Sequence, residues 1–264
     1  METKTQVSNR ITELFKNKKE SILNIYFTAG FPELNDTVTI LKALEKSGAD
    51  IIEIGMPFSD PLADGPTIQE SSEIALHNGM TMKLLFEQLK DIRKEVKVPL
   101  LLMGYLNPVM QYGVENFCRK AAEIGIDGII LPDLPMDEYN DQYKELFESH
   151  NLSNIFLVTP NTSDERLKLI DETSSGFIYV VSSDSTTGNT KDITKADSYF
   201  KKIQDKKLNN PTLIGFNIHD RKSFEFACRF SNGAIIGSAF IKTIRMADNL
   251  EATIRDFVSS VKNG

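Results

Sequence analysis

Eight short apolar runs rich in β-branched residues recur along the chain, and a stretch with helical periodicity follows each of them. Runs that are apolar on both faces are typical of parallel strands covered by helices. The predicted strands are Ile22–Thr28, Asp50–Ile54, Pro99–Met103, Gly128–Leu131, Asn154–Val158, Gly176–Val181, Pro211–Phe216 and Ala234–Gly237. The predicted helices are Leu34–Ser47, Met82–Val96, Val114–Ile124, Glu138–Ser149, Asp164–Glu172, Lys195–Lys206, Arg221–Phe230 and Leu250–Val261. This alternation predicts an α/β fold, a single (β/α)8 TIM barrel spanning residues 1–264 as one domain.

An extra N-terminal helix near Val7–Phe15 is expected to plug or cap the bottom of the barrel. Ser163 and Asp220 are placed as helix N-caps, and Gly48 and Gly125 as C-terminal stops. An open doubly wound sheet is the competing architecture. It would normally carry Gly-x-Gly-x-x-Gly after the first strand, and the sequence 29–32 reads Ala-Gly-Phe-Pro instead.

Composition and sequence pattern limit the classes of function that this chain can have. The formal net charge of −7 argues against nucleic-acid binding, which normally needs a basic stripe. No apolar run is long enough to predict a membrane span, and the polar N-terminus does not resemble a signal peptide, so a cytoplasmic protein is expected. Cys118 and Cys228 are expected to be reduced thiols, and the three scattered histidines do not predict a metal site.

Catalytic groups of such barrels lie at the C-terminal ends of the strands. Candidates at the predicted strand ends are Thr28, Glu53, Tyr105, Asp133, Thr159, Tyr179, Gly215-Phe216 and Gly237-Ser238. Two long loops, residues 55–80 and 182–191, follow the second and sixth strands and are expected to be functional lids.

Glu53 is the strongest single candidate because it stands inside an apolar, β-branched run. Burying a carboxylate there costs several kcal/mol, in order of magnitude, unless it is paired or protonated. Its parity with Ile51 directs it to one face of the strand, where an apolar wall would raise its pKa and suit it to proton transfer. The alternative is a structural carboxylate that accepts hydrogen bonds. Asp64 and Asp60 lie in a loop rich in Pro and Gly, where local turn formation is the favoured explanation for Asp64 and still more for Asp60.

Paired glycines at the ends of the last two strands, Gly215 and Gly237, indicate a phosphate site built from backbone N–H groups and the N-terminus of a short helix. Thr187-Gly188 after the sixth strand could contribute to it. The alternative is that these glycines only permit tight turns. No lysine stands at a predicted strand end, which disfavours a Schiff-base aldolase.

The run Glu53-Ile-Gly-Met-Pro-Phe-Ser-Asp-Pro-Leu-Ala-Asp-Gly-Pro-Thr-Ile-Gln69 resembles the signature of the tryptophan synthase alpha subunit family. The resemblance extends over essentially the whole chain. It includes Tyr26–Pro32, Met103–Pro108, Leu131–Pro135, Gly215-Phe216 and Ile236–Ala239.

The resemblance implies cofactor-independent cleavage of indole-3-glycerol phosphate to indole and glyceraldehyde 3-phosphate. It implies Glu53 as the main acid–base group and Asp64 as the group that binds the indole N–H. It further implies that Tyr179 supports Glu53 and that Thr187 orders the loop after strand six against Asp64. The whole expected substrate-binding set is Tyr26, Thr28, Met103, Tyr105, Ile130, Tyr179, Thr187, Gly188, Gly215, Phe216, Gly237 and Ser238.

The implied partner is a PLP-dependent tryptophan synthase β subunit in an α2β2 heterotetramer, with residues near Pro61, Asn107 and Pro135 toward the interface. Two positions depart from the family pattern, Ser185 in the loop after strand six and Asn217 after strand seven. Two other functions stay open: a phosphate-binding barrel that only activates another subunit, and another phosphate-ligand barrel of tryptophan or histidine biosynthesis.

Overall fold

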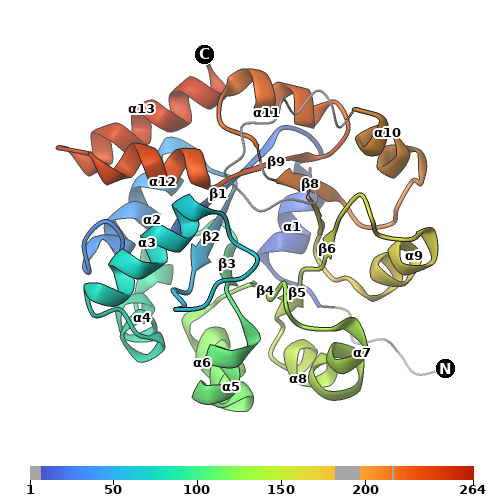
Figure 1. The fold of residues 1–264 in the computed structure, drawn as a ribbon, viewed down its shortest axis with the longest axis horizontal. Helices are drawn as coiled ribbons and strands as arrows, with labels where there is room; N and C mark the ends of the chain where they lie inside the picture. Colours follow the sequence, from blue (N-terminus) through green and yellow to red (C-terminus); the bar gives the residue numbers. More distant parts are fainter. Residues whose placement is uncertain (1–6, 182–196, 216) are drawn as a thin grey trace.

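The computed structural model describes residues 7–181, 197–215 and 217–264, and its strands form one parallel sheet curled into a ring with helices outside it (Figure 1). The nine strands are β1 Ile22–Thr28, β2 Ile51–Gly55, β3 Leu100–Met103, β4 Gly128–Ile130, β5 Ser153–Asn154, β6 Leu157–Val158, β7 Ile178–Val181, β8 Thr212–Gly215 and β9 Gly233–Ile236. Their order in the sheet is β5-β4-β3-β2-β1-β9-β8-β7-β6.

The ring closes through the fifth predicted strand, which the structure divides in two. β5 pairs with β4, whereas β6, two residues further along the same segment, pairs with β7. Between them, the Ile155 N–H donates to the Ile129 carbonyl at 3.0 Å and the Tyr179 N–H donates to the Phe156 carbonyl at 2.9 Å. The fifth predicted strand therefore corresponds to both β5 and β6, which is why nine strands are labelled where eight were predicted. The predicted barrel is confirmed.

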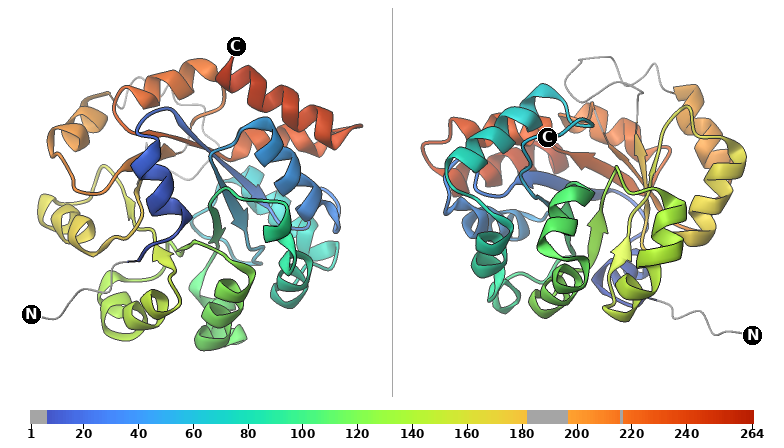
Figure 2. Two further views of the ribbon diagram at one scale, coloured as in Figure 1. Left: turned by 180° about the vertical axis from the view of Figure 1, so that it is seen from behind. Right: turned by 60° about the horizontal axis from the view of Figure 1, so that its bottom comes forward.

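Helices pack around the barrel, and the first of them covers one of its ends (Figure 1, Figure 2). They are α1 Arg10–Asn17, α2 Asp36–Ser47, α3 Pro66–His77, α4 Met82–Leu89, α5 Leu106–Tyr112, α6 Val114–Ile124, α7 Met136–Glu138, α8 Lys144–Ser149, α9 Asp164–Thr173, α10 Asp197–Asp205, α11 Arg221–Cys228, α12 Ser238–Arg245 and α13 Leu250–Lys262, with a 3-10 turn at Ile92–Lys94 and a π turn at Tyr139–Tyr143. Ser163 and Asp220 cap their helices and Gly48 and Gly125 end theirs in the left-handed conformation, as predicted. Within the described ranges, none of these helices is long and apolar enough to cross a membrane.

The prediction of one long loop over residues 55–80 is wrong, because α3 occupies its second half. Gly65 precedes this helix and Pro66 opens it, a favourable start that the sequence reading missed. The buried face of α3 includes Ser71 and Ser72 beside Ile68, and these serines hide its apolar periodicity. The helices α5 and α12 were also not predicted. The loop 182–191 lies outside the described residues.

The sheet separates two apolar cores. The outer core packs strand residues such as Ile52 and Ile54 against the helices, and the inner core fills the barrel with Ile51, Leu101 and Ile130 among others. α1 closes the end at which the strands begin (Figure 2), where Ile11 joins the inner core. The predicted N-terminal plug is therefore confirmed, with α1 as its helix.

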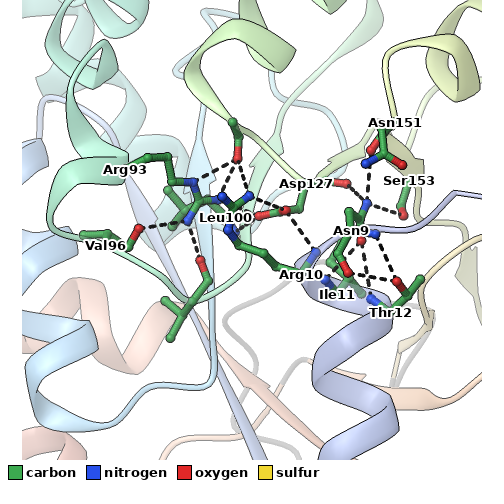
Figure 3. A network of polar contacts seen from close by, with 12 residues as sticks. Asn9, Arg10, Ile11, Thr12, Arg93, Val96, Leu100, Asp127, Asn151 and Ser153 are labelled. Atoms are coloured by element: carbon green, nitrogen blue, oxygen red, sulfur yellow. Dashed lines mark hydrogen bonds and ion pairs between the residues drawn. The ribbon is translucent and has the colours of Figure 1, made fainter.

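A polar network holds α1 to the bottom of the barrel (Figure 3). The buried Asp127 carboxylate accepts from Arg93 at 2.5 Å, from Arg10 at 3.1 Å and from the Leu100 N–H at 3.0 Å. Asn9, the N-cap of α1, donates to the Asp127 carbonyl at 2.7 Å. Burial lowers the pKa of Arg93 to about 10, which leaves it charged at neutral pH. The network stabilises the end of the barrel opposite the strand termini that carry the candidate groups.

We expect Asp127→Asn to lower the free energy of unfolding by about 2 kcal/mol, because Arg93 loses its charged partner in a buried setting. Urea unfolding followed by circular dichroism measures the change. Glu123→Gln, which removes one partner of an exposed ion pair on α6, is the control and should leave the unfolding midpoint unchanged. Equal midpoints for Asp127→Asn and the parent chain would contradict this assignment.

Candidate active site

Glu53 lies inside the barrel on β2, opposite Tyr26 of β1 in the strand register. Its side chain is completely buried, as expected from its position inside an apolar run. Its Oε1 accepts a 2.5 Å hydrogen bond from Nδ2 of Asn24, also on β1. Burial raises the pKa of Glu53 to about 8, and the bond from Asn24 partly opposes that rise. A carboxyl group with such a pKa is suited to proton transfer near neutral pH.

Asp64 lies in the short loop between β2 and α3, where Tyr105 from the end of β3 holds it. The Tyr105 hydroxyl donates to Oδ2 of Asp64 at 2.9 Å and accepts from the Ala63 N–H at 3.0 Å. Gln69 of α3 donates to the Asp64 carbonyl at 2.8 Å. Burial raises the pKa of Asp64 to about 6, against the lowering effect of the Tyr105 bond. Asp64 is thus a positioned carboxyl group and not only a turn residue.

Two tyrosines, the half-buried Tyr26 on β1 and the buried Tyr179 on β7, face both carboxyl groups. Burial raises the pKa of each phenol far above its usual value, and the negative charges of Asp64 and Glu53 raise it further. Tyr26 lies against Gly55 and Tyr179 lies against Gly215, so closely that a Cβ at either glycine would overlap the phenol oxygen. The four side chains therefore gather at one place in the barrel mouth.

The other predicted groups at this mouth are mainly apolar. Met103 ends β3 and Ile130 ends β4, paired in the register. Thr28, at the end of β1, shares a 2.6 Å hydrogen bond with Ser71 of α3. A small pocket is lined by Tyr26, Met56, Phe58, Pro61, Asp64, Ser72, Met103, Gly104, Tyr105 and Pro132. Two tyrosines, two methionines and Asp64 thus border one cavity.

The predicted phosphate groups lie on neighbouring strands β8 and β9. Gly215 ends β8, and Gly237 precedes α12, whose first residue is Ser238. No side chain among the described residues caps α12, so its first N–H groups are oriented to bind an anion. Asn217 has φ 58°, in the left-handed region that asparagine tolerates better than most residues. Thr187, Gly188, Phe216 and Ser185 lie outside the described residues.

Two other candidates from the strand ends serve local structure. Both Oδ atoms of Asp133 accept from the Leu106 N–H at 3.0 Å, at the start of α5. Thr159 accepts from the Asn161 N–H at 3.2 Å within its own turn. Neither contacts Glu53 or Asp64 in the part of the chain that the structure describes.

The sequence reading missed Asn24, Ser71 and Gly55. Asn24 shares strand parity with Tyr26, so a polar residue in an apolar run could have identified it as it identified Glu53. Ser71 required α3 to be recognised first. Gly55 had no predicted role in the site, and its role in accommodating Tyr26 depends on a contact between strands.

Fold and site together define a TIM-barrel protein with two carboxyl groups of raised pKa at the ends of its strands and a helix N-terminus after its last strand. The family described as tryptophan synthase alpha chain matches residues 13–263, and this chain belongs to it. The chain is thus an enzyme of tryptophan synthesis, and its family implies a β-subunit partner.

Relatives and solved structures agree with that assignment. The tryptophan synthase alpha chain of Flavobacterium psychrophilum is 58% identical over 254 residues, covering 96% of this chain and 99% of the relative. That of Flavobacterium johnsoniae is 55% identical, covering 96% of this chain and 100% of the relative. The crystal structure of tryptophan synthase subunit alpha from Legionella pneumophila str. Paris superimposes with a TM-score of 0.87 at 32% identity, covering 96% of this chain and 97% of that one.

Proposed function

We propose that this chain cleaves indole-3-glycerol phosphate into indole and glyceraldehyde 3-phosphate, a carbon–carbon lyase reaction that needs no cofactor in this chain. The single observation that carries the proposal is the buried Glu53 carboxyl group with a pKa of about 8, together with a second carboxyl group, Asp64, whose pKa is also raised. Acid–base groups of this kind can carry out a retro-aldol cleavage without metal or Schiff base.

Glu53 is the proton carrier in this proposal. The bond between indole C3 and the first glycerol carbon breaks, and its electron pair returns to the indole ring. Indole C3 gains a proton, and the hydroxyl on the first glycerol carbon loses one as it becomes the aldehyde. A single carboxyl group that cycles between its two protonation states near neutral pH can move both protons.

Asp64 accepts a hydrogen bond from the indole N–H and stabilises the positive charge that develops when C3 is protonated. Tyr26, Met103 and Ile130 flank the ring, Thr28 and Tyr105 complete its surroundings, and Tyr179 supports Glu53. Gly215, Gly237 and Ser238 bind the phosphate, together with Gly188 and Phe216, and Thr187 orders its loop against Asp64. The uncapped start of α12 and its place beside β8 support that assignment.

We further propose that the whole chain acts as one domain in the cytoplasm and joins a PLP-containing β subunit in an α2β2 heterotetramer. The interface includes residues near Pro61, with Asn107 and Pro135. Support comes from Leu62, which is 89% exposed in the loop beside Asp64, and from Met110 on α5, which is 54% exposed. A partner that covers this face would bury both apolar side chains.

The test is indole release from indole-3-glycerol phosphate by the purified chain, alone and with a tryptophan synthase β subunit. We expect slow release alone and faster release with the β subunit. The absence of indole in both assays would refute the enzyme and favour a barrel that only activates its partner.

Tyr105→Phe should reduce kcat about fivefold, because the Asp64 carboxylate loses a neutral donor worth about 1 kcal/mol. The pKa of Asp64 should rise further, which moves the acidic limb of the kcat–pH profile to higher pH. Tyr112→Phe is the matched control, because Tyr112 is the last residue of α5, the helix that Tyr105 precedes. This variant should keep the kcat and the pH profile of the unaltered chain. Unchanged kcat and pH profile in Tyr105→Phe would show that Asp64 is positioned by other groups.

A further inference from the structure

Asn24 is the one uncharged polar side chain that hydrogen-bonds Glu53 in the described part of the chain. Both residues are 0% exposed, and Nδ2 of Asn24 donates to Oε1 of Glu53 at 2.5 Å. The other flanking groups in the register of this layer are apolar, since Asn24 lies opposite Ile51 of β2 and Ile235 of β9. Burying an amide in this layer costs free energy unless it is hydrogen-bonded, so its presence there requires a hydrogen-bonding role.

The two oxygens of Glu53 differ as a result. Oε1 is occupied by Asn24, whereas Oε2 is buried and has no hydrogen-bond partner among the described residues. A protonated carboxyl group carries its proton on one oxygen and accepts on the other. Because Oε1 already faces an N–H donor, the proton belongs on Oε2, which is the oxygen left for a ligand.

The ionisable groups around Glu53 cannot determine which of its oxygens carries the proton. Tyr26 from β1, Tyr179 from β7 and Asp64 from the loop after β2 face the same region, and all three are neutral or negative. None of them favours a negative charge on Glu53. Burial raises the pKa of Glu53 to about 8, and Asn24 supplies the opposing contribution.

We propose that Asn24 is a positioning residue for proton transfer at Glu53: its amide holds Oε1 as an acceptor and so assigns Oε2 as the oxygen that takes and gives the proton. The inference rests on the proposed lyase function for its catalytic meaning, but the coupling between the two side chains exists without substrate. Asn24 itself need not touch the substrate. Valine here would fill similar space and could not direct the proton.

The first experiment uses the unaltered chain without substrate. The side-chain amide resonances of Asn24 and the carboxyl carbon of Glu53 are followed by NMR between pH 5 and pH 10. We expect the Asn24 amide to shift with the same midpoint as the Glu53 carboxyl, and this shift to vanish in Glu53→Gln. If the Asn24 amide resonances do not shift as Glu53 titrates, the proposal is overturned. This result can be obtained even if no variant of Asn24 folds.

The second experiment compares Asn24→Val with Asn154→Val, which replaces a buried asparagine on β5 whose side-chain oxygen has no hydrogen-bond partner among the described residues. In Asn24→Val we expect the Glu53 midpoint to rise by about one pH unit, and the rising limb of kcat with pH to move with it. At neutral pH, kcat should fall about tenfold with KM little changed, and recover at higher pH.

Asn154→Val should keep the pH profile of the unaltered chain. If Asn24→Val keeps the Glu53 midpoint and the pH profile while the unaltered chain releases indole, only the role of Asn24 is refuted. If the unaltered chain releases no indole but the two resonances titrate together, the lyase function fails and the coupling stands.

Discussion

Glu53→Gln should lower kcat for indole release at least about a hundredfold, the low end for a positioned acid–base group. Glutamine keeps the shape and can still accept from Asn24 through its carbonyl oxygen. It cannot carry the proton from the glycerol hydroxyl to indole C3. Substrate affinity should change little, because the proposed phosphate contacts lie at the ends of β8 and β9. Steady-state kinetics of the isolated chain measure both quantities.

The same variant should be more stable than the parent chain at neutral pH. In the unfolded chain Glu53 titrates near 4.5, whereas in the folded chain its pKa is about 8. Between these values the folded state holds a proton that the unfolded state has released. The parent chain therefore loses stability as pH rises through this window, by about 1 kcal/mol per pH unit, and no further above it.

Glu53→Gln cannot titrate, so its stability advantage should be absent at pH 4 and grow up to pH 8. Urea unfolding at several pH values measures it. Glu73→Gln, on the exposed side of α3, is the matched control and should change neither kcat nor the pH dependence. Near-normal turnover in Glu53→Gln would refute Glu53 as the proton carrier.

Asp64→Asn should reduce kcat by about a hundredfold, since a carboxylate that stabilises developing positive charge becomes a neutral amide. Binding of inorganic phosphate or glycerol phosphate should persist, because Asp64 lies in the β2–α3 loop and not with the glycines of β8 and β9. Kinetics with indole-3-glycerol phosphate and a separate phosphate-binding titration distinguish the two effects.

Asp60→Asn offers a control in the same loop. Asp60 is exposed and accepts a hydrogen bond from the neighbouring Ser59, so its loss should leave kcat of the isolated chain unchanged. A similar loss of turnover in both variants would mean that the loop responds to any lost carboxylate. The special role of Asp64 would then fail.

Much of this barrel could be predicted because strand burial and helix periodicity are local properties of the chain. The predicted strand Ile22–Thr28 is β1 residue for residue, and the caps at Ser163 and Asp220 were found from residue type alone. Glu53 was identified for a similar local reason, since a carboxylate among isoleucines conflicts with its surroundings.

Errors occurred where local pattern and burial disagree. α3 was taken for a loop because its buried face carries serines, one of which hydrogen-bonds Thr28 across the barrel mouth. The fifth strand divides because the two halves of one short segment pair with different neighbours to complete the ring.

The order of residues thus determined a ring of parallel strands, a helix at its closed end and a carboxyl group buried near its open end. Folding alone decided which side chains meet there. Asn24 reaches Glu53 across 29 positions, and Tyr105 reaches Asp64 across 41. The proton affinity of each carboxyl depends on its depth in the barrel and on one distant donor, and neither is encoded in its neighbours along the chain.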